Sequence, residues 1–180
     1  MLNNFVGDSG SGGTKGLVPA PAAGDAAALK YLKADGNWTI VPTPASSQST
    51  PADPTSTTSV AANGVMMGLA GSVTPAKTGT IMIVLTGDCD NATASRGVQI
   101  QLRTGTGTAP TNGATATGTQ RGATVNMFQN NASVRTPFTV NAVVSGLTSG
   151  TTYWIDTSIA STGGAGTARI RDISISTIEI

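Results

Sequence analysis

Apolar and polar residues alternate with a period of two along most of the chain after residue 63. The pattern is clear in residues 98–103 (VQIQLR), 138–144 (FTVNAVV) and 153–159 (YWIDTSI). A period of two places alternate side chains on opposite faces, which is typical of strands that bury one face. Residues 80–86 (TIMIVLT) are apolar on both faces, which predicts a strand in the middle of a sandwich or against another subunit.

Weaker patterns predict further strands at 65–72 and 125–128, although Gly68 and Gly71 interrupt the first of these. Residues 168–180 predict an unusually long last strand. Its apolar phase slips after Ile170, which indicates a β-bulge or burial of both faces. We expect loops at 87–91 and 104–122 and a turn at 163–166.

Seven to eight strands with turn signals between them predict an all-β protein. We expect residues 63–180 to form an antiparallel β-sandwich, jelly-roll-like, as a knob domain. An extended N-terminal segment with at most one short helix should precede it. The order of strands also resembles that of trimeric jelly-roll domains in complement-like and viral knob proteins.

The first 62 residues follow a different pattern. Residues 1–15 are polar and glycine-rich around an apolar tip, and Pro19 and Pro21 make residues 16–23 extended. Asp25 is placed to cap a short helix over 26–34, which would need a surface to pack on. Residues 41–62, rich in Pro, Ser and Thr, predict a semi-extended linker.

Residues 7–38 contain three ordered phrases, GLVPAP at 16–21, GDAA at 24–27 and LKADGNW at 32–38. This segment resembles the N-terminal anchor of bacteriophage virion surface proteins such as small fibres, spikes and head-decoration proteins. The resemblance implies that residues 1–40 attach the chain to a virion, with the β domain facing solvent. The apolar residues expected to form this virion anchor are Leu2, Phe5, Val6, Leu17, Val18, Pro19, Pro21, Leu32 and Trp38.

The composition favours association between copies. The hydrophobic fraction is 38% and the aromatic fraction only 4%, and the chain is rich in small residues. Such a sequence suits close subunit contacts better than a large monomeric core. We expect a homo-oligomer, a trimer in the favoured reading. Because the last strand is apolar on both faces, its isoleucines form the predicted oligomer seam: Ile173, Ile175, Ile178 and Ile180.

Charge and residue usage argue against several functions. The net charge is +1 with no basic stripe, so nucleic acid is not an expected partner. We expect no membrane insertion and no signal peptide, because no apolar run approaches a bilayer span. The single cysteine, Cys89, cannot form an intrachain disulfide, which fits assembly in the host cytoplasm.

The chain contains no histidine, so serine triads and Cys–His pairs are excluded. Asp156 and Asp172 are the remaining candidates for a pair of catalytic carboxylates, and the segment 88–91 (DCDN) for a calcium loop. For the 88–91 segment, a turn between two strands is the better interpretation. The glycine-rich residues 104–107 lack the following Gly-Lys-Ser/Thr and the helix of a phosphate-binding loop. We therefore expect no enzymatic activity, no cofactor, no metal site and no catalytic residue.

These observations predict a bacteriophage virion structural protein located in the virion, as a capsid decoration protein or head fibre. Its expected partners are its own copies and capsid, tail or neck proteins. The alternative is a short tail fibre or receptor-binding protein. In that case a host glycan would be bound through the 104–122 loop and Trp154.

Overall fold

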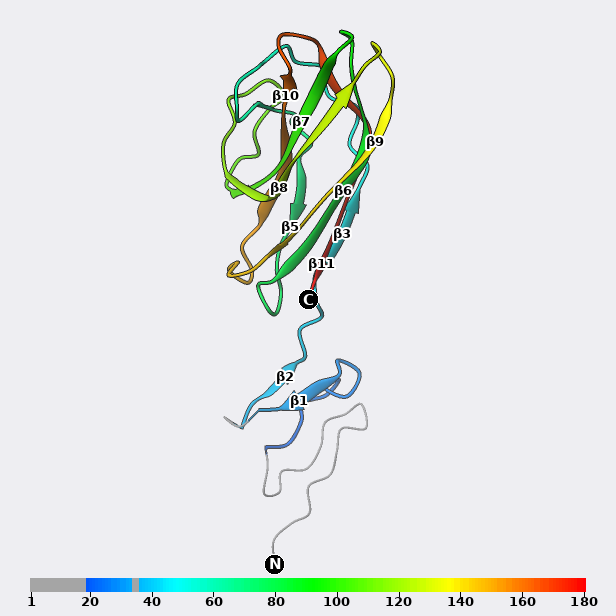
Figure 1. The fold of residues 1–180 in the computed structure, drawn as a ribbon. Helices are drawn as coiled ribbons and strands as arrows, with labels where there is room; N and C mark the ends of the chain where they lie inside the picture. The colour runs from blue at the N-terminus through cyan, green and yellow to red at the C-terminus, as the bar shows by residue number, and fades with distance from the viewer. Residues whose placement is uncertain (1–18, 34–35) are drawn as a thin grey trace, which may run out of the picture. The chain divides into compact units, whose positions relative to one another are not determined.

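The computed structural model describes residues 19–33 and 36–180, which belong to two compact units divided between Thr43 and Pro44. Each unit is described by itself. Figure 1 traces the chain and names its strands.

The first unit contains a small hairpin of β1 (Lys30–Leu32) and β2 (Trp38–Ile40), paired antiparallel with Tyr31 opposite Thr39. The helix expected over 26–34 is wrong for the described residues, since 23–29 form turns. A helix this short has too few hydrogen bonds to offset its nucleation cost. The Asp25 carboxylate instead accepts hydrogen bonds within the turn, from the Ala22 amide at 2.6 Å and the Lys30 ammonium at 2.5 Å.

The second unit, residues 44–180, is an antiparallel β-sandwich, as predicted. Among the described residues of the whole chain there is no helix. Its strands are β3 (Ser46–Ser49), β4 (Val65–Met66), β5 (Gly71–Val73), β6 (Ile81–Asn91), β7 (Arg96–Thr106), β8 (Thr119–Gln129), β9 (Thr136–Val144), β10 (Tyr153–Thr162) and β11 (Ala168–Glu179).

The strands form two sheets (Figure 1). The first, which we call the β6 sheet, has the order β3–β11–β6–β9. The second, the β10 sheet, has the order β4–β10–β7–β8, and β5 also pairs with β10. Most consecutive strands therefore lie in different sheets, the exceptions being β4 with β5 and β7 with β8, and this arrangement is jelly-roll-like, as expected.

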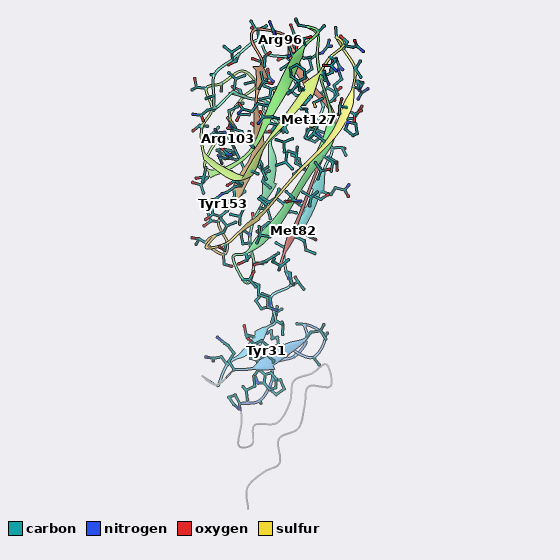
Figure 2. The ribbon with its side chains drawn as sticks, in the orientation of Figure 1. Tyr31, Met82, Arg96, Arg103, Met127 and Tyr153 are labelled. Atoms are coloured by element: carbon teal, nitrogen blue, oxygen red, sulfur yellow. The ribbon has the colours of Figure 1, made fainter. Side chains whose placement is uncertain are left out.

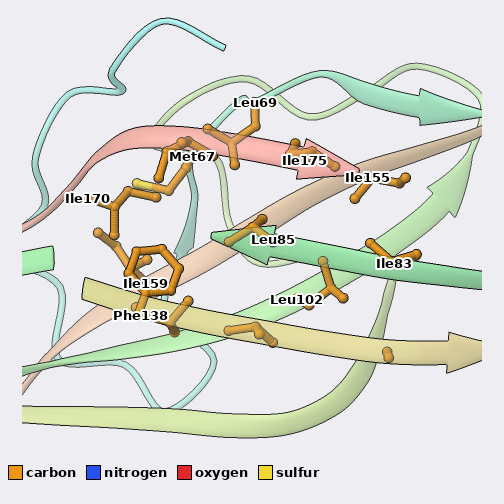
Figure 3. Packing of buried hydrophobic residues seen from close by; sticks show 14 of the residues in the cluster. Met67, Leu69, Ile83, Leu85, Leu102, Phe138, Ile155, Ile159, Ile170 and Ile175 are labelled. Carbon is orange, nitrogen blue, oxygen red and sulfur yellow. The ribbon is translucent and has the colours of Figure 1, made fainter. Parts of the chain in front are cut away.

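The core lies between the inner faces of the two sheets, and Figure 3 shows its packing. Ile83 and Leu85 of β6 face Leu102 of β7 and Ile155 and Ile159 of β10 within one cluster of buried residues. All five are at most 1% exposed. The inward positions are those that the period of two selected, because alternation leaves each strand one buried face.

Several boundaries differ from the sequence prediction. The strand predicted at 65–72 is interrupted, with only β4 and β5 paired to β10. The loop expected at 87–91 is wrong, because β6 continues to Asn91 in register with β11. The loop expected at 104–122 is shorter, since β7 ends at Thr106 and β8 begins at Thr119.

The phase slip in the last strand is a β-bulge, which is one of the two interpretations of the pattern. The register of β11 against β6 shifts between Arg171 and Ser174, and Asp172 has a positive φ of 50°. The extra residue in the bulge changes the inward-facing positions from even-numbered to odd-numbered residues. Ile170 and Ile173 therefore both face the core.

Residues 44–62, which the composition places in a linker, lie in the second unit. Residues 46–49 form β3 at the free edge of β11, and Thr57 exchanges two backbone hydrogen bonds with Ala168 at 3.0 and 2.8 Å. An open sheet edge presents unpaired N–H and C=O groups, and an extended Ser/Thr-rich segment satisfies them.

Candidate attachment and association surfaces

The predicted virion anchor divides into residues inside and outside the described part of the chain. Leu2, Phe5, Val6, Leu17 and Val18 lie outside it. The Trp38 indole N–H donates a hydrogen bond of 3.0 Å to the Pro19 carbonyl, Pro21 is buried and Leu32 is half-buried. None of the four side chains is fully exposed, and Pro19 and Trp38 are joined within the first unit.

Other apolar side chains of the first unit are exposed, and sequence reasoning missed them as surface residues. Leu29 is 79% exposed, Tyr31 44%, Ile40 55% and Val41 48%. Figure 2 labels Tyr31 on its strand. Leu29 also has a positive φ of 52°, which is uncommon for a residue with a branched side chain. The hairpin and the residues next to it therefore expose apolar side chains on the surface of the first unit.

The four isoleucines of the predicted oligomer seam have different environments. Ile173 and Ile175 are each 2% exposed and belong to the core of their own chain, so they are not free for a contact with another copy. Ile178 and Ile180 are 51% and 56% exposed. The bulge at Asp172 explains the division, because it fixes which parity of the strand faces inward.

Ile178 belongs to an apolar row across the outer face of the β6 sheet. It lies directly opposite Met82 on β6, and Met82 lies opposite Val143 on β9. Met82 is 37% exposed and Val143 63%. Directly opposed residues of an antiparallel pair have Cβ atoms about 5 Å apart, so the three side chains form one continuous strip.

The other end of the same face is charged. Asp90 is 1% exposed and accepts hydrogen bonds from Arg169 and, at 2.8 Å, from Arg171. Arg135 pairs with Asp88 at 3.1 Å and with the exposed Asp172. These acids are therefore neutralised by arginines.

The candidate catalytic pair is not brought together. Asp156 lies on β10 and is fully buried, whereas Asp172 lies on β11 in the other sheet and exposes 69% of its side chain. The amide N–H groups of Gly68, Leu69 and Thr157 donate to the Asp156 carboxylate at 2.9, 3.0 and 2.7 Å. Burial raises the pKa of Asp156, and these amide donors oppose that shift.

The 88–91 segment is part of β6. Cys89 faces the core at 1% exposure, and burial, together with the charges of Asp90 and Asp88, raises the pKa of its thiol to about 12. Within residues 19–33 and 36–180, no three His, Cys, Asp or Glu side chains come close enough together to hold a metal ion.

A second buried carboxylate, which sequence reasoning missed, closes the end of the sandwich. Glu179 is 3% exposed and accepts hydrogen bonds from five backbone amides and one hydroxyl. The donors are the amides of Ala45 (2.8 Å), Ala76 (2.9 Å), Lys77 (2.7 Å), Thr78 (2.5 Å) and Gly79 (3.1 Å), and the Thr78 hydroxyl (3.3 Å). This cluster ties the start of β3 and the 76–79 loop to the last strand.

The part of the outer face of the β10 sheet that β10 and β7 form is covered by the chain's own loops. The Gln101 side chain donates to the Ala62 carbonyl at 3.1 Å, and the Gly113 amide donates to the Met66 carbonyl at 2.8 Å. Beneath these loops Arg103 is 6% exposed, donates to Ser158 and Gln101, and has its pKa lowered by burial. Figure 2 labels Arg103 on this sheet.

The covering loops also bury Trp154, the aromatic residue named above for glycan contact. Trp154 is 6% exposed, and its indole N–H donates to the Thr106 carbonyl at 3.2 Å. Gly118 lies against its ring, where an added Cβ would be 2.3 Å from the ring and 2.6 Å from the Thr104 carbonyl oxygen. The side chain is therefore not available as an exposed stacking platform.

Gly118→Ala is expected to lower the free energy of unfolding by about 2 kcal/mol, because the methyl group overpacks Trp154 at a positive φ. Urea denaturation measures the difference. Gly107→Ala is the matched control: φ is 78° against 70° at Gly118, but no atom lies within 4 Å of the new Cβ. It should cost about 1 kcal/mol, for the backbone strain alone. Equal losses in the two variants would show that Gly118 is not packed against the ring.

No protein-family model matches the chain, and no curated protein matches it. Among the described residues, no helix is long and apolar enough to cross a membrane. Among solved structures, a chain in the structure of infectious bursal disease virus Gt strain is similar, with 15% sequence identity and a TM-score of 0.45. The match covers 79% of this chain and 35% of that chain, so this chain spans about a third of its length.

Proposed function

We propose that this chain is a non-enzymatic structural protein of a bacteriophage virion, acting as a capsid decoration protein or head fibre. In this proposal, residues 1–40 attach to the particle and the sandwich faces solvent and associates with further copies. Two observations support it: the ordered GLVPAP and LKADGNW phrases, and a separate small unit with exposed apolar side chains.

The observation that carries the proposal is the exposed hairpin. Isolated two-stranded hairpins are marginally stable in water, and exposed apolar side chains are stabilised by contact with a partner. Burial of a large apolar side chain contributes about 2 kcal/mol. Several copies held together by their sandwiches would add the effect of avidity, so weak individual contacts suffice for firm attachment.

Replacing Leu29 and Tyr31 together by aspartate is expected to reduce the copies per purified particle at least tenfold, because it charges the proposed contact. Quantitative mass spectrometry of particles measures the loading, and deletion of residues 1–43 gives the fully detached reference. Val60→Asp, at a 60% exposed position of the second unit, should load like the unaltered chain. Normal loading of the deletion variant would contradict attachment through this end of the chain.

The position on the particle distinguishes a decoration protein or head fibre from a short tail fibre. This sequence contains no long repeated shaft, which favours a short spike or decoration protein. Antibodies against the sandwich, viewed on intact particles by electron microscopy, should label the capsid. Label at the tail tip would instead support the receptor-binding alternative.

A further inference from the structure

The apolar row of the β6 sheet lies in a wider uncharged part of the sheet's outer face. Two further rows run parallel to Ile178–Met82–Val143 and face outward in the same way. They are Ser176–Val84–Asn141 and Ser174–Thr86–Thr139. On the neighbouring edge strand, Ser46 and Gln48 lie opposite Ile178 and Ser176. Eleven adjacent outward positions therefore carry only apolar or uncharged polar side chains.

This face differs from the outer face of the β10 sheet in being uncovered. The outward residues of β10 and β7 are buried under the chain's own loops, as in Trp154 at 6%, Arg103 at 6% and Gln101 at 4%. On the outer face of the β6 sheet, Met82 and Val143 are 37% and 63% exposed. Figure 2 labels Met82 on this sheet. An exposed antiparallel sheet face ordinarily carries polar and charged residues.

We infer that this face, which we call the β6 face, is the contact between copies of this chain. The inference deepens the self-association in the proposed function and moves the seam from the last strand alone to three strands, β11, β6 and β9. Ile178 and Ile180 stay in the seam, and Met82, Val84 and Val143 join it.

The charge distribution identifies a second copy as the occupant. A charged partner would lose hydration at its charges against eleven positions that offer no counter-charge, which is costly. An identical copy brings an equally uncharged surface. At the charged end, Arg135 and Asp172 expose 43% and 69% of their side chains, so each copy offers both signs beside the uncharged rows. Like charges therefore need not meet across the seam.

A contact between copies must extend beyond the eleven uncharged positions. With strands about 4.8 Å apart and a rise of about 3.3 Å per residue, these positions cover about 350 Å². Two copies in face-to-face contact would bury about 700 Å² there, against a lower bound of about 1,000 Å² for a specific interface. The charged end of the face and Ile180 would supply the remaining area.

The full chain should therefore sediment as an oligomer at about micromolar concentration, and Met82→Asp should convert it to single chains. The substitution places a charge at the centre of the seam, where it would be desolvated without a partner. Sedimentation equilibrium and native mass spectrometry measure the state. Phe128→Asp, a 63% exposed position on β8 of the other sheet, is the control and should remain oligomeric.

Two measurements keep the test independent of misfolding. Val143→Asp changes a 63% exposed residue of the edge strand β9 and should give the same single chains, with the melting temperature of the unaltered protein diluted to single chains. In the unaltered protein, peroxide oxidation of Met82 should be slow in the oligomer and should rise at least fivefold on dilution into single chains.

A single-chain mass for the unaltered protein overturns the inference, and so does an unchanged oligomer in both aspartate variants. The result is separable from the attachment proposal. If the hairpin variant loads normally while Met82→Asp gives single chains, attachment fails and the β6 face stands. If loading depends on the hairpin while the β6 variants remain oligomeric, the opposite holds.

Discussion

Replacing Asp156 by alanine is expected to lower the free energy of unfolding by about 3 kcal/mol, one of the largest losses from a single substitution in this protein. The carboxylate holds the amides of Gly68, Leu69 and Thr157 at a site with no exposed area. Alanine leaves these three donors buried without an acceptor, and each such group costs about 1 kcal/mol or more. Urea denaturation followed by circular dichroism measures the loss.

Asp156→Asn is the matched control, since it retains the shape and one acceptor oxygen. That oxygen can still accept from the Leu69 and Thr157 amides, while the new amide group would face the Gly68 donor. The loss should be smaller than for alanine, about 1 kcal/mol. A loss from alanine no greater than that from asparagine would show that the three amides find other partners.

Replacing Glu179 by glutamine is expected to lower the melting temperature markedly at neutral pH and to remove much of the protein's acid sensitivity. Five backbone amides converge on the carboxylate and favour its charged form. Burial by itself would raise the pKa of Glu179, but the amide donors outweigh burial, and the pKa lies well below its ordinary value of 4.5.

The pH dependence follows from this depressed pKa. Because the folded chain binds the proton more weakly than the unfolded chain, the stabilisation is fully present above the ordinary value of 4.5. It is lost progressively as the pH falls below that value towards the pKa of the folded state. The melting temperature of the unaltered protein should therefore fall more steeply than that of the variant between about pH 5 and pH 3. Lys77→Gln is the control, because it changes a side chain in the 76–79 loop and leaves the Glu179 carboxylate in place, so the steep fall should remain. Parallel curves of melting temperature against pH for Glu179→Gln and the unaltered chain would contradict the role of Glu179.

The alternation of apolar and polar residues was sufficient to predict the sandwich. In residues 98–103 and 138–144, the apolar side chains point into the core, as the period of two predicts. The phase slip after Ile170 is the β-bulge at Asp172. The period is local information, because neighbouring side chains on a strand must point to opposite faces. Gly and Asp at 87–88 suggested a loop, but pairing with β11 and β9 outweighs their low strand propensity.

The candidate surfaces were only partly predictable. Pro19 and Trp38 were expected to contact a partner, and the structure gives them an internal hydrogen bond. Ile173 and Ile178 look alike in sequence, yet one is 2% and the other 51% exposed. Nothing in residues 65–70 or 76–79 indicated that these backbones would gather around Asp156 and Glu179.

The sequence by itself thus determined the all-β sandwich and the inward faces of its long strands, and it predicted a virion anchor in the first forty residues. Tertiary structure alone decided which apolar residues stay exposed, where the uncharged β6 face lies and which carboxylates are buried. The physical reason is that burial depends on register and on which loop covers which sheet. Both are set by pairings between residues far apart in the chain, such as Met82 with Ile178 and Ala45 with Glu179.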